Sequence, residues 1–171
     1  MKKQAGKFIW TPSPQEIEEE RLWIEKEKVE IGMARLKKLA LEARKVRLNA
    51  YKSYSGYSVG AAVLTHAGNV YSAANAEVVT YTETDHAERG AISAAINNGE
   101  IRKYKFGRKF IRAIAVSHPG ESGPCGGCRQ RIAEHADNCL ILDVNPKGKI
   151  TRITSLKILF PYAFTPSHLG K

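Results

Sequence analysis

The sequence predicts an α/β fold in which helices cover a sheet. Two observations predict it: short strand-like runs alternate with helical segments of moderate length from residue 58 onwards, and the turns between them carry Gly, Asn and Pro. This alternation is typical of layered α/β sandwiches. A chain of 171 residues is also long enough to bury the core of one domain.

The first fifty residues predict two consecutive helices. Ser13, Pro14 and Glu16 form a helix start with a capping box, and Gly32 is expected to break the helix in two before it ends near Ala50. Apolar residues recur at intervals of seven, which predicts an amphipathic helix with a buried stripe. They are Ile17, Ile24 and Ile31, and in parallel Leu22, Val29 and Leu36.

The remainder of the chain predicts five strands and three helices. A helix is expected from Asp85 to about Asn97, a second one opens at the segment PCGGC, and a short one precedes the Pro-containing tail. The predicted strands are Ser58–Leu64, Asn69–Ala76, Phe110–Ser117, Cys139–Val144 and Lys149–Thr154.

Composition limits the classes of function. The net charge of +10 invites a nucleic-acid partner, but the one dense basic stretch, Ile101–Arg112, is more often a solvated loop than a binding groove. No apolar run reaches the length of a membrane span. The segment MKKQAGKFIW has positive charges but no apolar core or small-residue cleavage site behind them, so we do not expect it to be a signal peptide. Three cysteines do not make a disulfide framework. We therefore expect a cytoplasmic protein that acts without membrane or nucleic acid.

The segments "HAE" and "PCGGC" predict a catalytic zinc site. His86, Cys125 and Cys128 give the three ligands that such a site takes, which leaves one position for water. His86 is expected to open one helix, and Cys125 and Cys128 are expected to open another. The partial positive charge of a helix N-terminus lowers the pKa of a thiol. Gly126 and Gly127 are expected to allow close backbone approach. The alternative, a helix-capping histidine and an unrelated buried cysteine pair, satisfies fewer of these positional demands.

Glu88 is expected to act beside the metal and not as a ligand. Positions i and i+2 of a helix project in different directions, so Glu88 would lie next to the open position left by His86. A carboxylate there suits the transfer of protons. A purely structural zinc site would fill the fourth position with a further ligand.

These motifs resemble those of a known family. H-x-E followed by P-C-x-x-C is the signature of zinc nucleobase deaminases, and the segment from Met33 to Gly170 resembles the single-domain cytidine deaminases over about four fifths of the chain. The resemblance extends to "EARKVRLNAYKSYSGYSVGAAVL", to "NAE", to "PCGGCRQ" and to the ending "LKILFPYAFTPSHLG".

The resemblance implies a fold, a domain division and a reaction. The fold would be a three-layer α-β-α sandwich with a mixed sheet of about five strands. Residues 1–32 would form a partly helical N-terminal extension, and residues 33–171 the catalytic domain. The enzyme would use Zn²⁺ to deaminate cytidine and 2′-deoxycytidine hydrolytically in pyrimidine salvage. It would be a homo-oligomer, for which a tetramer is favoured over a dimer.

The resemblance also implies roles for individual residues. Asn75 and Glu77 would bind the ribose hydroxyls, and Tyr57 would pack against the pyrimidine ring, although a core aromatic residue is the plain alternative. Ala87 would offer backbone groups to the edge of the base, and Phe164 would reach the site of a neighbouring subunit. His66, His118, His135, His168 and Cys139 are expected to be surface or packing residues.

Departures from the family pattern concern substrate choice. The first ligand is a histidine where many short members have cysteine, Val78 and Val79 replace small polar residues, and the basic loop is longer. One alternative is therefore the same chemistry on a modified cytosine nucleoside such as blasticidin S. A polynucleotide deaminase would fit the net charge, but Glu77 would repel a phosphate backbone.

Overall fold

The protein was analysed as a computed structural model that describes residues 12–103, 105, 107–120 and 122–170. Its strands lie within two residues of the predicted ones at either end. They are β1 (Gly60–Thr65), β2 (Val70–Ala74), β3 (Ile111–Ser117), β4 (Leu140–Val144) and β5 (Ile150–Ser155). The helices are α1 (Pro14–Ile31), α2 (Met33–Arg47), α3 (Ala87–Asn97), α4 (Glu100–Lys103), α5 (Gly126–His135) and α6 (Leu156–Leu159), with the 3₁₀ turns η1 (Tyr81–Glu83) and η2 (Pro166–Leu169).

The five strands form one mixed sheet in the order β2-β1-β3-β4-β5. β3 and β4 run parallel, and the three other neighbouring pairs are antiparallel. The parallel pair requires a crossover, which α5 provides between β3 and β4. The sheet thus has the predicted size and the predicted mixture of strand directions.

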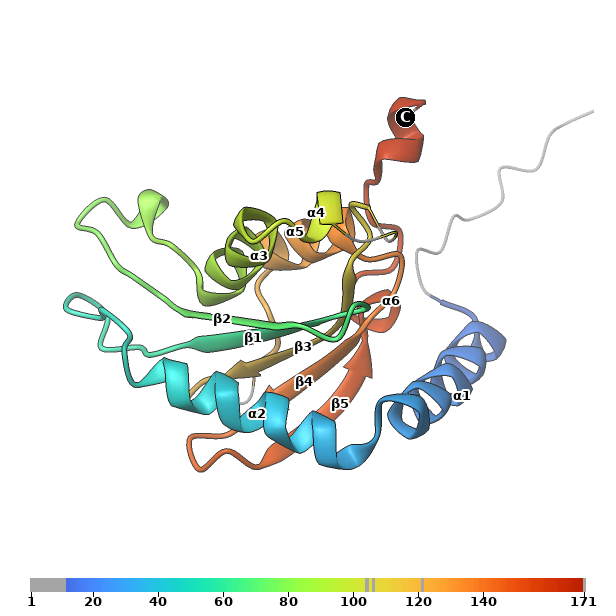
Figure 1. Cartoon of the computed structure of the whole chain (residues 1–171), viewed down its shortest axis with the longest axis horizontal. Helices are drawn as coiled ribbons and strands as arrows, with labels where there is room; N and C mark the ends of the chain where they lie inside the picture. The colour runs from blue at the N-terminus through green and yellow to red at the C-terminus, as the bar shows by residue number, and fades with distance from the viewer. Residues whose placement is uncertain (1–11, 104, 106, 121, 171) are drawn as a thin grey trace, which may run out of the picture.

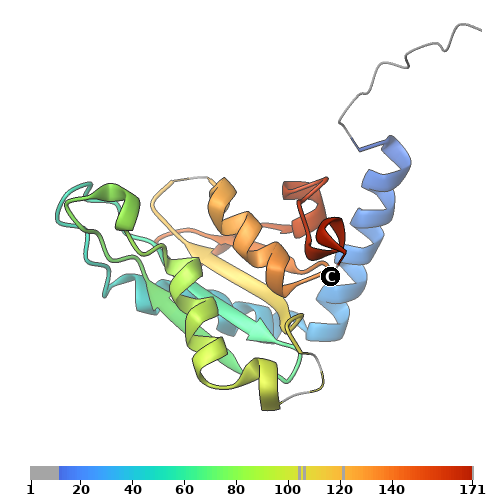
Figure 2. The same ribbon diagram turned by 90° about the horizontal axis from the view of Figure 1, so that it is seen from above.

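Helices cover both faces of the sheet and complete the three predicted layers. α3 and α5 lie over one face and α2 lies against the other, as Figures 1 and 2 show. Alternate residues of each strand face opposite layers. Ala61 and Val63 of β1 belong to the core under α3 and α5, whereas Ala62 and Leu64 belong to the core under α2. Gly60 permits this packing, because a methyl group there would overlap the backbone of Ala43 in α2.

The N-terminal helix α1 begins with the predicted capping box and ends at the predicted break, Gly32. Only part of its predicted stripe is buried. Ile24 and Ile31 join the core under α2, but Ile17, Leu22 and Val29 are 39%, 64% and 82% exposed, so the prediction of burial is wrong for these three. α1 lies beside β5 and the end of α2 and not on the middle of the sheet, so one side of the helix is buried.

Ion pairs and hydrogen bonds join α1 to the rest of the chain. Arg112 of β3 lies 3.2 Å from a carboxylate oxygen of Glu27 and 3.1 Å from one of Glu30. Asn138 donates a hydrogen bond of 2.9 Å to Glu20. These contacts neutralise one end of the basic stretch 101–112. Among the described helices, none has the length and apolar composition needed to cross a membrane.

Candidate active site

Three chain segments meet at one edge of the sheet because β1 pairs with both β2 and β3. Gly60, the first residue of β1, lies opposite Ala74 at the end of β2 and Ser117 at the end of β3. The next residues along those strands, Asn75 and His118, therefore flank the segment that leads into β1. A pocket of about 250 Å³ opens at this edge.

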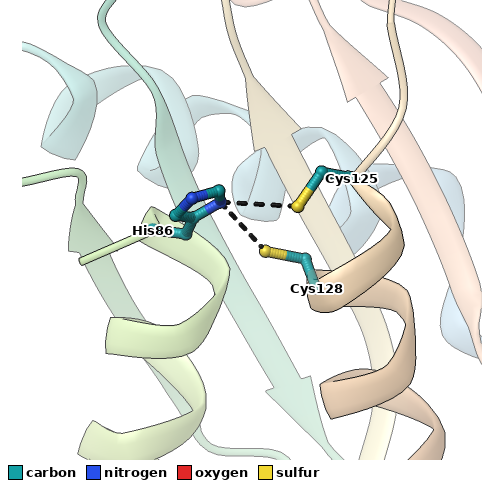
Figure 3. Close-up of side chains that lie close together, drawn as sticks. All are labelled: His86, Cys125 and Cys128. Atoms are coloured by element: carbon teal, nitrogen blue, oxygen red, sulfur yellow. Dashed lines mark hydrogen bonds between the residues drawn. The ribbon is translucent and has the colours of Figure 1, made fainter. Parts of the chain in front are cut away.

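The three predicted metal ligands lie together at the ends of two helices. His86 is the N-cap of α3, Cys125 is the N-cap of α5, and Cys128 follows in the first turn of α5. Nδ1 of His86 lies 3.5 Å from Sγ of Cys125 and 3.4 Å from Sγ of Cys128, and the three atoms are within 4.8 Å of one another. Figure 3 shows both sulfur atoms pointing toward the imidazole ring.

These distances fit a tetrahedral zinc ion. Zinc–nitrogen and zinc–sulfur bonds of about 2.0 and 2.3 Å at a tetrahedral angle place the nitrogen and sulfur atoms about 3.5 Å apart. Burial raises the pKa of the Cys128 thiol far above its usual range, and the carboxylate of Glu88 raises it further. A cation held between the donors reverses that direction, because a coordinating thiol is deprotonated.

Glu88 lies in the same pocket as His86 and Cys125. It is the second residue of α3 and only 4% exposed. The carboxylate also lies close enough to Cys128 to form a hydrogen bond with its sulfur. A buried carboxylate beside the metal donors, facing the pocket, is placed to exchange protons with a molecule bound there.

Glu77 is held by the turn that precedes Tyr57. Its carboxylate accepts hydrogen bonds from the backbone N–H groups of Tyr54 and Ser55, at 2.8 and 3.1 Å, and from the Ser55 hydroxyl. The Ser55 hydroxyl in particular lowers the pKa of Glu77. Glu77 is therefore a fixed anion in the wall of the pocket.

Asn75 fixes the segment before β1 that carries Tyr57. Its Oδ1 accepts a hydrogen bond of 2.7 Å from the N–H of Val59, and its Nδ2 donates one of 3.0 Å to the carbonyl oxygen of Tyr57. One hydrogen of the Nδ2 group stays available for a molecule in the pocket. Asn75 is thus a structural clamp as well as a pocket residue, which the sequence did not suggest.

The other predicted site residues differ in position. Tyr57 lines the pocket, and Ala87 is fully buried at the first position of α3. Phe164 is 58% exposed and does not line the pocket of its own chain. Its carbonyl oxygen accepts a hydrogen bond from Gln130, and its ring stacks on His168 with centroids 5.4 Å apart.

Sequence reasoning missed the position of His118. It was expected to be a surface or packing residue, yet it lines the pocket together with Tyr57 and Glu88. The only signal in the sequence is a polar residue directly after a buried strand.

The turn that carries Cys125 and Cys128 differs in part from the expectation for its glycines. Apart from neighbouring residues of the helix, no described atom lies within 4 Å of a methyl group placed on Gly126 or Gly127, so no other segment of the chain requires glycine there. Arg129 follows Cys128 in α5. It donates hydrogen bonds to the carbonyl oxygens of Pro124 and Leu159, at 2.7 and 2.9 Å, and so joins the turn before Cys125 to the end of α6.

A larger cavity of about 780 Å³ lies between α1 and the C-terminal segment. None of the predicted site residues lines it. The chemistry is therefore concentrated in the smaller pocket at the edge of the sheet.

Comparison with known proteins agrees with this geometry. Residues 33–142 match the family described as "Cytidine and deoxycytidylate deaminase zinc-binding region". The chain is 37% identical over 136 residues to a cytidine deaminase of Sporosarcina psychrophila, a match that covers 79% of this chain and 95% of that protein. It is 31% identical over 118 residues to a blasticidin-S deaminase of Bacillus cereus, with coverage of 64% and 78%.

Solved structures give the same result. The crystal structure of cytidine deaminase from Burkholderia pseudomallei superposes with a TM-score of 0.65 at 34% identity, over 74% of this chain and 96% of that one. The shared fold, the shared sequence and a donor set suited to zinc support one conclusion. The chain belongs to the cytidine and deoxycytidylate deaminase family and is a hydrolase whose cofactor is zinc.

Proposed function

We propose that the protein deaminates cytidine and 2′-deoxycytidine to uridine and 2′-deoxyuridine, with one water consumed and one ammonia released. The observation that carries this proposal is that a single pocket is lined by His86, Cys125, Glu88, Asn75 and Glu77. Its volume of about 250 Å³ lies near the lower end of the roughly 300–1,000 Å³ usual for small-molecule sites. A free nucleoside suits such a space better than a larger ligand.

His86, Cys125 and Cys128 would hold zinc at one end of the pocket. When bound, zinc supplies Lewis-acid activation of a water molecule at neutral pH. The helix N-termini that carry these residues direct free N–H groups and partial positive charge toward the two sulfurs. These dipoles favour the thiolate form of both cysteines and oppose the burial that raises the pKa of Cys128, and Arg89 and Arg131 lie on the outer side of the same donors.

Glu88 would move the protons of the reaction. It would take one proton from the attacking water and deliver it to N3 of the pyrimidine, and then take the second proton from the new hydroxyl group at C4 and deliver it to the exocyclic amine, which leaves as ammonia. The bond between C4 and the amine nitrogen would break, whereas the new bond between C4 and the water oxygen would remain in the product. Ala87, directly before Glu88, would present its backbone to the edge of the base.

Asn75 and Glu77 would hold the sugar at the other end of the pocket. Because the carboxylate of Glu77 is fixed by Ser55 and Tyr54, it accepts hydrogen bonds from hydroxyl groups with little loss of side-chain entropy. The free hydrogen of Asn75 Nδ2 would donate to a hydroxyl oxygen. Tyr57 would pack against the pyrimidine ring between these two ends.

The proposal is tested by ammonia release from a substrate panel. The panel is cytidine, 2′-deoxycytidine, cytosine, CMP, blasticidin S and single-stranded RNA. We expect turnover of the two nucleosides and little of cytosine, which lacks the sugar, or of CMP and RNA, whose phosphates Glu77 repels. Turnover of RNA with none of cytidine would contradict the proposal.

The role of Glu88 has its own test. Glu88→Gln keeps the shape of the side chain and should retain zinc while kcat falls by about 10²–10⁴-fold. Glu134→Gln is the matched control, because Glu134 lies on the outer side of the metal ligands and outside the pocket. Full activity of the Glu88 variant would rule out proton transfer by this residue.

A second candidate substrate is a modified cytosine nucleoside. The similarity to the blasticidin-S deaminase of Bacillus cereus favours it, and Val78 and Val79, where the family has small polar residues, are both exposed. The chemistry would be unchanged. The same panel distinguishes the two, because preference for blasticidin S over cytidine would reverse the order of kcat/KM.

We also propose that the protein is a homo-oligomer, and we favour a tetramer over a dimer. In support, Phe164 is exposed and lies outside the pocket of its own chain, so its ring, which stacks on His168, lies where a neighbouring subunit can contact it. Light scattering on the purified protein measures the assembly, and a monomer with full activity would contradict it. The cytoplasmic location and the division at residue 32 stay predictions.

A further inference from the structure

His118 occupies a position that the proposed mechanism does not use. It follows β3 directly, is 3% exposed, and lines the pocket with Glu88 and Tyr57. Its backbone N–H donates to the carbonyl oxygen of Val144 at 3.2 Å, which fixes the residue to the sheet. The imidazole ring is therefore held by the strand register and not by a mobile loop.

The two ring nitrogens of His118 have different surroundings. Nδ1 lies 3.5 Å from the hydroxyl of Tyr57, and the ring also bonds to the backbone of Gly120. Nε2 is buried and has no hydrogen-bond partner among the described residues. A buried polar atom without a partner is costly and rare in folded proteins, and at the wall of a pocket it indicates a ligand atom.

The two nitrogens therefore differ in what they leave for a ligand. Nδ1 has neighbours within the protein, the hydroxyl of Tyr57 among them, whereas Nε2 is the position at which the ring can bond to a bound molecule.

We infer that His118 is a further substrate-binding residue, whose Nε2 forms a hydrogen bond with the pyrimidine base. This inference rests on the proposed function. The base is favoured over the sugar because Glu88 and Tyr57, which are assigned to the base, lie beside His118 and line the same pocket, whereas Asp143 and Arg152, whose charges also act on the ring, do not line it. Asn75 and Glu77, assigned to the sugar, bond instead to the segment 54–59. The cytosine ring offers both a donor, its exocyclic amine, and an acceptor, O2.

A pair of variants separates the two nitrogens. Glutamine places a polar atom near the position of Nε2, whereas asparagine reaches only the position of Nδ1. We expect His118→Asn to raise KM for cytidine about tenfold, the loss that one hydrogen bond to a buried group represents, with kcat within about threefold. His118→Gln should keep KM within about threefold of the unchanged protein.

The control is His135→Asn. His135 is also a buried histidine, with Nδ1 bonded to the carbonyl oxygen of Arg108, but it lies outside the pocket. This variant should lower the melting temperature without changing KM. Zinc content and melting temperature are measured for all three variants, so that loss of folded protein is not read as loss of binding.

Sugar-modified substrates test the assignment to the base. If Nε2 contacts the base, His118→Asn raises KM by the same factor for cytidine and for its 2′-, 3′- and 5′-deoxy forms. Disappearance of the effect with one deoxy form would overturn the assignment, as would an unchanged KM in His118→Asn or an equal loss in His118→Gln. Absence of turnover by the unchanged protein on every cytosine nucleoside would instead refute the proposed function.

Discussion

Asn75 should be needed for stability as well as for substrate binding. Asn75→Ala removes the acceptor of the Val59 N–H and the donor to the Tyr57 carbonyl oxygen. A buried group left without its partner costs about 1–3 kcal/mol. Water in the pocket can satisfy the Tyr57 carbonyl, because Tyr57 is exposed. We therefore expect a total loss of about 2 kcal/mol, mostly from the Val59 N–H.

Urea denaturation of the zinc-loaded protein measures this loss. The matched control is Asn98→Ala, because Asn98 is exposed at the end of α3 and bonds only to the carbonyl oxygen of Ala94, one turn away. The control should change the free energy of unfolding by no more than about 0.5 kcal/mol. If Asn75→Ala unfolds at the same urea concentration as the unchanged protein, Asn75 does not hold the segment before β1 in place.

Four further predictions follow from the packing and the site. Gly60→Ala should destabilise the protein by about 1–3 kcal/mol in urea, because the new methyl group overlaps the backbone of Ala43; an unchanged midpoint would show that α2 shifts freely. Ile24→Ala should cost about 2–4 kcal/mol in the same assay if α1 is packed as described, and an unchanged free energy would mean that α1 is not. Removal of zinc by a chelator should abolish turnover and lower the melting temperature, and added zinc should restore both; activity that survives complete metal removal would exclude a catalytic metal. Ser55→Ala should raise the pKa of Glu77. In the unchanged protein, the hydrogen bonds to the Glu77 carboxylate stabilise the fold above the ordinary pKa of 4.5, and this stabilisation is lost as the pH falls through the lowered pKa of the folded protein. Acid denaturation followed by circular dichroism should then begin at a higher pH, and the same midpoint in both proteins would contradict this.

The zinc donors could be predicted because their signal is local. His86, Cys125 and Cys128 each stand at a helix start that the sequence itself announces, and two helix starts separated by one buried strand have few ways to meet. Glu88 follows from His86 by its place in the first turn of the same helix. The fold class followed in the same way from the alternation of strands and helices.

Burial on α1 could not be predicted in full, because the helix carries apolar residues on more than one side. The two series at intervals of seven, one through Ile24 and the other through Leu22, satisfy the same periodicity. Which of them is buried depends on where the helix docks. Docking beside β5 buries Ile24 and leaves Leu22 in solvent.

His118 escaped prediction for a different reason, which is the register of the sheet. The sequence shows that a polar residue follows β3, but only the pairing of Gly60 with both Ala74 and Ser117 brings that residue to the same edge as Asn75. A shift of one residue in the β1–β3 pairing would turn the side chain to the opposite face of the sheet. The pocket therefore has two halves with different origins. Helix starts supply the metal donors and Glu88, to which we assign the chemistry, whereas strand ends and the turn before β1 supply the wall to which we assign binding of the rest of the substrate. On this assignment, a change at a strand end, such as His118→Asn, should alter binding of the cytosine compound and leave the deamination chemistry the same.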